Sequence, residues 1–249
     1  MPRTLKQILY GLFFLGILAV TIWIIVIPRY TAEVATCIDD IQNQNETDVD
    51  CGGSCVDCEL RNLSLQPGGV KIIEVLEKSS LLVKVKNPSN NYGAFGVPYK
   101  IEVTGLLGQS IGVIEGELNI EDGEEKYIAV VGFDASKNDI SGADFSLGEF
   151  DFTPKADLID YDFEIEDVAV TFPEKMVQAK GILINDSGFD IPEIVLTALF
   201  YTSEGDITNV GTSFISNIKA FEKRDFLISV PSNDLFLDID QTEISWRVI

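Results

Sequence analysis

A run of 20 residues without a charge lies close to the N-terminus and extends from Ile8 to Ile27. At a rise of ~1.5 Å per residue, a helix of this length spans the roughly 30 Å hydrocarbon core of a bilayer. Helices of soluble proteins are seldom apolar on every side. The run is also longer than the apolar region of a signal peptide, and no small-x-small cleavage site follows it. The sequence therefore predicts an uncleaved transmembrane helix at residues 8–27, preceded by a tail at residues 1–7.

The flanking charges predict which side of the membrane the rest of the chain occupies. Arg3 and Lys6 precede the apolar run, whereas Arg29 alone follows it closely. Basic residues near a transmembrane helix stay in the cytoplasm. We expect a single-pass protein of the cell membrane with a cytoplasmic N-terminus and extracytoplasmic C-terminal domains.

Composition excludes several classes of function. The chain has 18 basic and 40 acidic residues and a formal net charge of −22. A nucleic-acid-binding protein needs a basic face, so we expect no nucleic-acid partner. The chain has no histidine, which excludes Ser-His-Asp and Cys-His nucleophiles and HExxH zinc sites. We expect a protein without catalytic activity. A membrane-tethered hydrolase that cleaves glycans with two carboxylates is the enzymatic alternative.

All four cysteines lie in one short segment, within the stretch at residues 28–59 that we call the collar. They are Cys37, Cys51, Cys55 and Cys58. In an oxidising compartment, an even number of cysteines in a loop-rich segment indicates disulfides, here two with three open connectivities. The alternative is a four-thiolate zinc site that uses the Cys55-x-x-Cys58 spacing. We favour disulfides, because a segment with so few large apolar residues needs covalent closure.

The collar is also rich in oxygen ligands of the kind that Ca²⁺ binds. The candidate ligands are Asp39, Asp40, Asn43, Asn45, Glu46, Asp48 and Asp50. An acidic, solvated loop is the alternative, because Asn and Asp favour turns for their own sake. Calcium is the one cofactor that the sequence suggests.

The same segment resembles a short cysteine motif, C-x-[DN]-x-I-x-[ND]-x-x-E-T-x-x-D-C-G-G-x-C-x-x-C, seen in cell-surface proteins of archaea and bacteria. The matching residues are Cys37, Asp39, Ile41, Asn43, Glu46, Thr47, Asp50, Cys51, Gly52, Gly53, Cys55 and Cys58. The motif covers about a tenth of the chain. The resemblance implies exposure at the cell surface and specifies no activity.

After the collar the apolar residues follow a period of two. In the stretch 80–87, Leu81, Val83 and Val85 alternate with Leu82, Lys84 and Lys86, and residues 243–248 alternate in the same way. This pattern predicts half-buried strands, and the turn-forming segments between them predict a mainly β fold of sandwich type.

Two parts of this β region are similar to each other at an offset of about 94 to 100 residues. The alignment pairs Asn87 with Asn185 and Pro98 with Pro192. One Ig-like sandwich has ~100 residues. We therefore predict two tandem Ig-like β-sandwich domains, at residues 60–154 and 155–249. A single larger barrel is the alternative.

The second of these predicted domains resembles the small extracytoplasmic sandwiches of the FxLYD and CARDB kind. The resemblance rests on the Asn185-x-Ser187 segment between two strands, on Leu199-Phe200-Tyr201 before a glycine turn, and on a strand at residues 222–230 that ends at Pro231. The resemblance implies a small extracytoplasmic β-sandwich.

Residues 159–166 alternate strictly between apolar and acidic side chains. Ile159, Tyr161, Phe163 and Ile165 share one face, and Asp160, Asp162, Glu164 and Glu166 share the other. The acidic face could bind cations or a basic partner. We favour an edge strand, because charge on an edge prevents pairing with a second molecule.

These features together predict a non-catalytic, single-pass cell-surface protein that presents two β-sandwich modules for interaction. Its partner is expected to be another envelope protein or a second copy of itself. An accessory subunit of an envelope or appendage assembly is the alternative.

Overall fold

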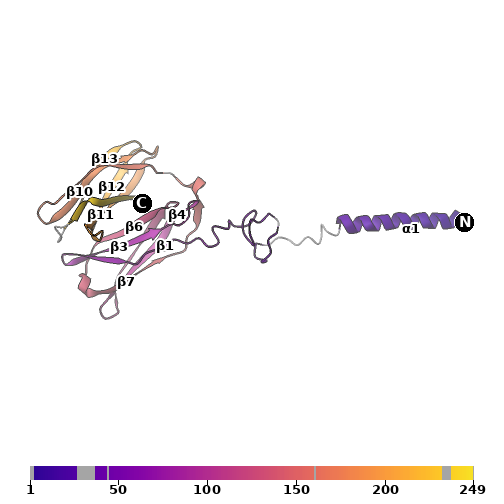
Figure 1. Cartoon of the computed structure of the whole chain (residues 1–249), viewed down its shortest axis with the longest axis horizontal. Helices are drawn as coiled ribbons and strands as arrows, with labels where there is room; N and C mark the ends of the chain where they lie inside the picture. The colour runs from indigo at the N-terminus through magenta and orange to yellow at the C-terminus, as the bar shows by residue number, and fades with distance from the viewer. Residues whose placement is uncertain (1–2, 27–36, 44, 160, 232–236, 249) are drawn as a thin grey trace. The chain divides into compact units, whose positions relative to one another are not determined.

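The computed structural model describes residues 3–26, 37–43, 45–159, 161–231 and 237–248. The chain divides into two compact units, residues 1–62 and residues 63–249. The first unit contains the apolar helix and the collar, and the second contains the strands (Figure 1).

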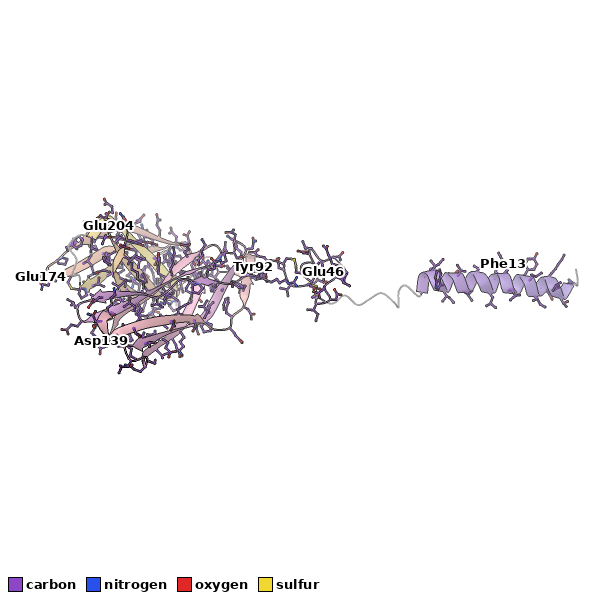
Figure 2. All side chains as sticks on the ribbon, turned by 60° about the horizontal axis from the view of Figure 1, so that its bottom comes forward. Phe13, Glu46, Tyr92, Asp139, Glu174 and Glu204 are labelled. Atoms are coloured by element: carbon purple, nitrogen blue, oxygen red, sulfur yellow. A yellow bond between two sulfur atoms is a disulfide. The ribbon has the colours of Figure 1, made fainter. Side chains whose placement is uncertain are left out.

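The apolar run is helical. Helix α1 (Arg3–Thr21) continues into a π-helical segment, Ile22–Val26. No residue of α1 is buried, and Figure 2 shows the side chain of Phe13 projecting away from the helix. Residues 3–25 form a helix that is long and apolar enough to cross a membrane, a property that some N-terminal signal sequences share. The predicted end of the span, Ile27, lies outside the described residues.

The first sandwich packs two antiparallel sheets against each other. Its strands are β1 (Gln66–Pro67), β2 (Lys71–Val75), β3 (Lys78–Lys86), β4 (Tyr92–Gly105), β5 (Ser110–Ile120), β6 (Glu125–Phe133), β7 (Ile140–Leu147) and β8 (Phe152–Pro154). In one sheet, β3 pairs with β1, β2 and β6; in the other, β4 pairs with β5, β7 and β8. Leu81, Val83 and Val85 of β3 face the core between the sheets, as their alternation predicts.

The second sandwich repeats this arrangement with fewer strands. Its strands are β9 (Phe163–Thr171), β10 (Met176–Asn185), β11 (Ile191–Thr202), β12 (Ile207–Ile218), β13 (Lys223–Pro231) and β14 (Leu237–Val248). Strand β10 lies between β9 and β13, and β11 lies between β12 and β14. The prediction of a mainly β protein with an N-terminal apolar helix, a disulfide-bonded segment and β-sandwiches is confirmed. The predicted boundary between residues 154 and 155 stays a prediction.

A buried asparagine holds the same corner in both sandwiches. Asn87 donates its side-chain N–H groups to the carbonyls of Tyr92 (2.7 Å) and Glu121 (2.8 Å). Asn185 donates in the same way to Phe189 (2.8 Å) and Lys219 (2.9 Å). The two asparagines are 98 residues apart, as the sequence alignment predicts.

The same offset places a second pair of residues in register. The backbone N–H of Asn87 donates to the carbonyl of Glu124, and that of Asn185 donates to the carbonyl of Glu222, each at 2.9 Å. Residues 121–124 of the first sandwich therefore correspond to residues 219–222 of the second.

The predicted match of Pro98 to Pro192 is wrong. Pro98 lies within β4 and pairs with Glu117 of β5, whereas Pro192 is the second residue of β11, before the ladder with β12 is continuous. The loop after Asn185 is one residue shorter than the loop after Asn87, counted to the carbonyl that each side chain binds. This one-residue difference changes the offset from 98 to 97, whereas the match of the prolines requires an offset of 94 and is therefore out of register.

The two sandwiches pack against each other through a third apolar layer, which we call the joint. At its centre lie Ile73, Leu82, Leu199 and Val210, all buried, with Val75, Tyr127, Ala129, Tyr201 and Ile207 packed around them. The sheet containing β3 thus has a core on each face, as does the sheet containing β11. Leu82, which the alternation assigns to the polar face of its strand, is buried because the second sandwich covers that face.

Candidate functional site

Two disulfides close the collar. Cys37 is bonded to Cys55, and Cys51 is bonded to Cys58. The structure thereby selects one of the three connectivities that the sequence left open. A zinc site with four thiolates is excluded in this structure, because all four cysteines form disulfides.

The backbone geometry of the collar requires glycine at residues 52 and 53. Gly52 and Gly53 have φ angles of +78° and +63°, and a Cβ atom at Gly53 would lie 2.2 Å from the carbonyl oxygen of Asn45. A Cβ at Gly52 would lie 2.3 Å from Oγ1 of Thr47. Only glycine fits this left-handed, crowded turn, which gives a physical reason for the Gly-Gly of the cysteine motif.

Acidic side chains hold the collar loop together by accepting backbone hydrogen bonds. Asp50 is buried and accepts the N–H groups of Asp39 (2.9 Å) and Asp40 (3.0 Å). Glu46 is also buried and accepts the N–H groups of Asn43 (3.0 Å) and Asp50 (3.3 Å). A loop without a β-ladder or helix must satisfy its backbone donors in this way.

These contacts bear on the seven predicted calcium ligands. Asp39, Asn43, Glu46 and Asp50 are brought together in one hydrogen-bonded cluster, which includes a bond from Asn43 Nδ2 to Asp39 Oδ2 (3.1 Å). Asp40, Asn45 and Asp48 are exposed. The carboxylates of the cluster already accept protein N–H groups, and those of Glu46 and Asp50 are buried, whereas the acidic-loop alternative expects them to be solvated. Calcium binding stays a prediction from the sequence.

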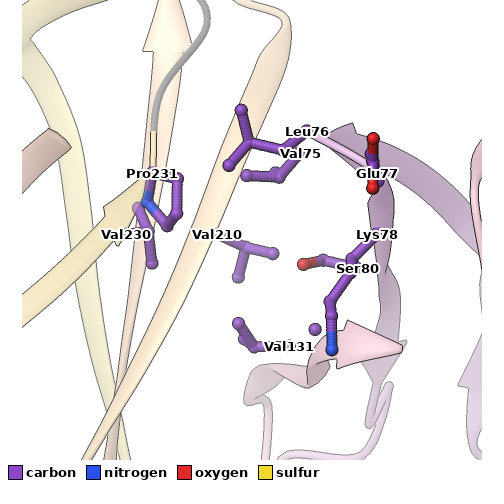
Figure 3. Close-up of a pocket in the computed structure, with 10 residues that line it drawn as sticks. Val75, Leu76, Glu77, Lys78, Ser80, Val131, Val210, Val230 and Pro231 are labelled. Atoms are coloured by element: carbon purple, nitrogen blue, oxygen red, sulfur yellow. The ribbon is translucent and has the colours of Figure 1, made fainter. Parts of the chain in front are cut away.

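A pocket opens at one end of the joint (Figure 3). It has a volume of about 490 Å³, within the ~300–1,000 Å³ range of small-ligand sites. Its lining is mostly apolar and comes from both sandwiches: Val75, Leu76, Glu77, Lys78, Ser80, Val131, Gly132, Val210, Val230 and Pro231. We call it the joint pocket.

One residue at this pocket adopts an unfavourable backbone conformation. Leu76 lies in the two-residue turn between β2 and β3, where Val75 pairs with Lys78. Its φ angle is +59°, and 54% of its surface is exposed. Turns of this kind favour glycine or asparagine at positive φ, so a leucine costs backbone strain and exposes apolar surface.

Polar side chains lie around the joint. The hydroxyl of Tyr201 donates to Glu243 Oε2 (2.8 Å), and burial together with this hydrogen bond raises the pKa of Tyr201. Asn119 of the first sandwich donates to the carbonyl of Val248 (3.3 Å), and Arg247 of the second sandwich donates to the carbonyl of Glu117 (3.3 Å).

Only the second half of the alternating acidic stretch, from Phe163 onward, belongs to a strand, and that strand lies at an edge of its sheet as predicted. Strand β9 begins at Phe163 and occupies an edge of its sheet, with β10 as its neighbour. Tyr161, Phe163 and Ile165 pack against the core of the second sandwich. Asp160 lies outside the described residues, and Ile159 is exposed.

Sequence reasoning missed the joint pocket entirely. Its residues come from the β2–β3 turn and from strands β2, β3, β6, β12 and β13, which are distant in the chain. One signal of an unusual turn was available in the sequence. The chain turns from one strand to the next within Val75-Leu76-Glu77-Lys78, although this stretch has no glycine, asparagine or proline.

Comparisons with known proteins give no family for this chain. No protein-family model matches it, and no curated protein is similar to it. Among solved structures, a red sea bream transglutaminase aligns with 75% of this chain at 11% sequence identity and a TM-score of 0.19. The alignment spans 31% of that enzyme. So low a TM-score carries no inference about fold or activity.

Proposed function

We propose that this chain is a single-pass cell-surface protein that presents its double sandwich as one non-catalytic binding module. The observation that carries the proposal is the joint. Because Leu82 and Leu199 are buried between the sandwiches, the two modules form one body with a fixed surface, including the joint pocket. A fixed surface lowers the entropy cost of binding a partner.

The N-terminal helix supports the anchoring part of the proposal. Its exposed side chains have no protein core to pack against among the described residues of the first unit, and the hydroxyl of Thr21 is satisfied within the helix by the carbonyl of Ile17 (2.8 Å). A helix whose polar groups are satisfied internally suits a bilayer. Arg3 and Lys6 favour a cytoplasmic N-terminus.

The collar supports an extracytoplasmic location for the rest of the chain. Disulfides persist in oxidising compartments and are rare in the cytosol. Closed by Cys37–Cys55 and Cys51–Cys58, the collar would act as a stapled spacer between anchor and binding module. The partners that suit such a module are other envelope proteins or further copies of this chain.

The experiment uses the full chain with a C-terminal tag in intact cells. We expect the protein to resist extraction with alkaline carbonate, to retain the apolar helix by intact mass, and to lose its tag to external protease once any outer envelope is removed. Free thiols should be absent on rapid alkylation. Purified protein should turn over none of a panel of glycan and peptidoglycan substrates.

Three outcomes would contradict the proposal. Release of a soluble protein that lacks the helix would show that the helix is a signal sequence. A tag that becomes cleavable only after lysis would reverse the orientation. Hydrolysis of a glycan, abolished by substitution of a pair of carboxylates, would favour the enzymatic alternative.

A further inference from the structure

A second large apolar residue with a strained backbone lies in the second sandwich, at the end away from the joint pocket. Eight non-glycine residues have a positive φ angle among those that the structure describes, and only Leu76 and Phe221 among them are large and apolar. Phe221 lies in the turn between β12 and β13, with φ +59° and 71% of its surface exposed. An aromatic residue at positive φ is a conformational outlier, and such outliers concentrate at functional positions.

The first sandwich shows what this turn contains when it serves only the fold. The 98-residue offset set by Asn87 and Asn185 places Gly123 at the position of Phe221. Gly123 has φ +66°, so the same left-handed turn is made there by the residue that adopts it most easily. The second sandwich carries an exposed phenyl ring at a position where glycine would meet the needs of the backbone.

Each of the three basic residues close to Phe221 is paired with an acidic residue, and Asp225 adds one further acidic side chain. Lys219 binds Asp190 (2.9 Å), Lys223 lies 3.3 Å from Glu166, and Arg224 binds Glu222. Three of the 18 basic residues of a chain with 40 acidic residues therefore flank this single turn. Elsewhere the net negative charge opposes the approach of a second copy, but this turn can approach one with little electrostatic repulsion.

We propose that copies of this chain associate head to tail, with Phe221 of one copy seated in the joint pocket of the next. The proposal names the partner in the proposed function as a second copy, and rests on that function. A dry cavity of ~150 Å³ is large enough to bind benzene, so a pocket of about 490 Å³ accommodates a phenyl ring together with part of its turn.

The topology prevents Phe221 from reaching its own pocket. Phe221 immediately precedes β13, which begins at Lys223, and Pro231 at the far end of β13 lines the pocket. Nine extended residues span about 30 Å. The side chain of Phe221, which we call the knob, and the joint pocket, which we call the hole, thus lie at opposite ends of one sandwich. The contact therefore joins different surfaces of two molecules. Such contacts propagate into rings or open filaments instead of stopping at a dimer.

Two variants separate the knob from the hole. Phe221→Gly introduces the residue found at the equivalent turn and should leave the melting temperature unchanged or raise it. Val131→Asp places a carboxylate in the pocket at a residue that is 41% exposed, where β6 departs from regular pairing with β3. Leu107→Gly is the matched control, because Leu107 is a turn residue with 91% exposure and is not among the positive-φ residues.

The experiment measures association by analytical ultracentrifugation of the full chain, reconstituted singly in nanodiscs so that no free detergent competes for the pocket. Wild type and Leu107→Gly should form species beyond the dimer as concentration rises. Phe221→Gly and Val131→Asp should each weaken association by roughly tenfold or more. A mixture of these two variants should form a one-to-one complex that grows no further, because it contains one intact knob and one intact hole.

Several results would overturn the inference. They are a wild type that stays monomeric, association that survives in either variant, and a variant mixture that stays monomeric. Raising the salt concentration should strengthen association by screening the net negative charge; weakening by salt would indicate ion pairs instead of an apolar contact. None of these readouts depends on membrane sidedness, so their failure leaves the proposed function to its own test.

Discussion

Lys126 of the first sandwich lies with its ammonium group 5.2 Å from the ring centre of Trp246 in the second sandwich. The lysine is almost fully buried and forms an ion pair with Glu124 at 2.9 Å. A buried lysine needs such partners, because removing its charge from water is costly. Through Lys126, the ion pair with Glu124 in the first sandwich contacts Trp246 in the second.

This relationship gives a prediction with an internal control. Lys126→Met keeps the length of the side chain but leaves Glu124 without its ion pair, and should lower the free energy of unfolding by about 1–3 kcal/mol. Lys100→Met removes an exposed ion pair to Glu102 with the same 2.9 Å separation, and should have a much smaller effect because water screens the exposed charges. Urea unfolding of the full chain compares the two. Equal effects would contradict a stabilising contact between the sandwiches.

The joint makes a second prediction at Leu82. Leu82→Ala should destabilise the protein by about 2–4 kcal/mol, as much as Leu81→Ala in the core of the first sandwich, because both side chains are buried. Leu199→Ala should act similarly from the other side of the joint. The measurement is again urea unfolding. A surface position would tolerate the change within ~0.5 kcal/mol, and that result at Leu82 would mean that the sandwiches do not pack together.

The repeated corner predicts matched effects at Asn87 and Asn185. Substitution of either by alanine removes the side-chain partner of two carbonyls, which are buried or partly buried, and of one backbone N–H, and should cost about 1–3 kcal/mol. Asn138→Ala, at an exposed position, serves as the control for loss of an amide. A large loss at one asparagine and none at the other, measured by thermal unfolding, would show that the two corners are not equivalent.

Reduction of the disulfides should loosen the collar and spare the sandwiches. Both bonds lie in the first unit, whereas both sandwiches lie in the second. We expect a reductant to expose residues 37–58 to limited proteolysis without a shift in the melting temperature of the sandwiches. A sandwich transition that shifts with reductant would contradict the separation of the two units.

Limited proteolysis of the collar also tests calcium binding. Added Ca²⁺ should slow cleavage of the oxidised collar if the predicted ligands bind it, and Asp50→Ala should abolish that protection.

The turn that holds Phe221 should respond to acid. The hydrogen bond from Lys219 lowers the pKa of Asp190, and the backbone N–H of Lys219 and the side chain of Arg224 lower the pKa of Glu222. Because these carboxyls bind protons less readily when folded, their contribution is present above the ordinary values of 3.8 and 4.5 and is lost as pH falls below them. Carboxyl ¹³C shifts should report midpoints below those values. Lys219→Met should return the midpoint of Asp190 toward 3.8; an unchanged midpoint would exclude the ion pair as the cause.

Local pattern was sufficient for the secondary structure and for much of the collar. The uncharged run predicts a helix because backbone groups must be satisfied internally in an apolar segment. Alternation around Leu81, Val83 and Val85 predicts a strand with one buried face, since side chains alternate along a strand. The even number of cysteines in one short, loop-rich segment predicts disulfides, and the Asn87–Asn185 match predicts the repeat. Each of these inferences uses residues close in sequence or a direct similarity between two segments.

The disulfide partners, the joint, the pocket and the role of the acidic collar residues were decided only by the tertiary structure. Leu82 has the same sequence context whether water or a second sheet covers its face, so its burial depends on Leu199, more than a hundred residues away. Periodicity shows which face of a strand meets its own core, but it does not show that the opposite face meets another. Contacts between distant strands depend on shape and on the summed burial of many residues, and a single segment carries no record of them.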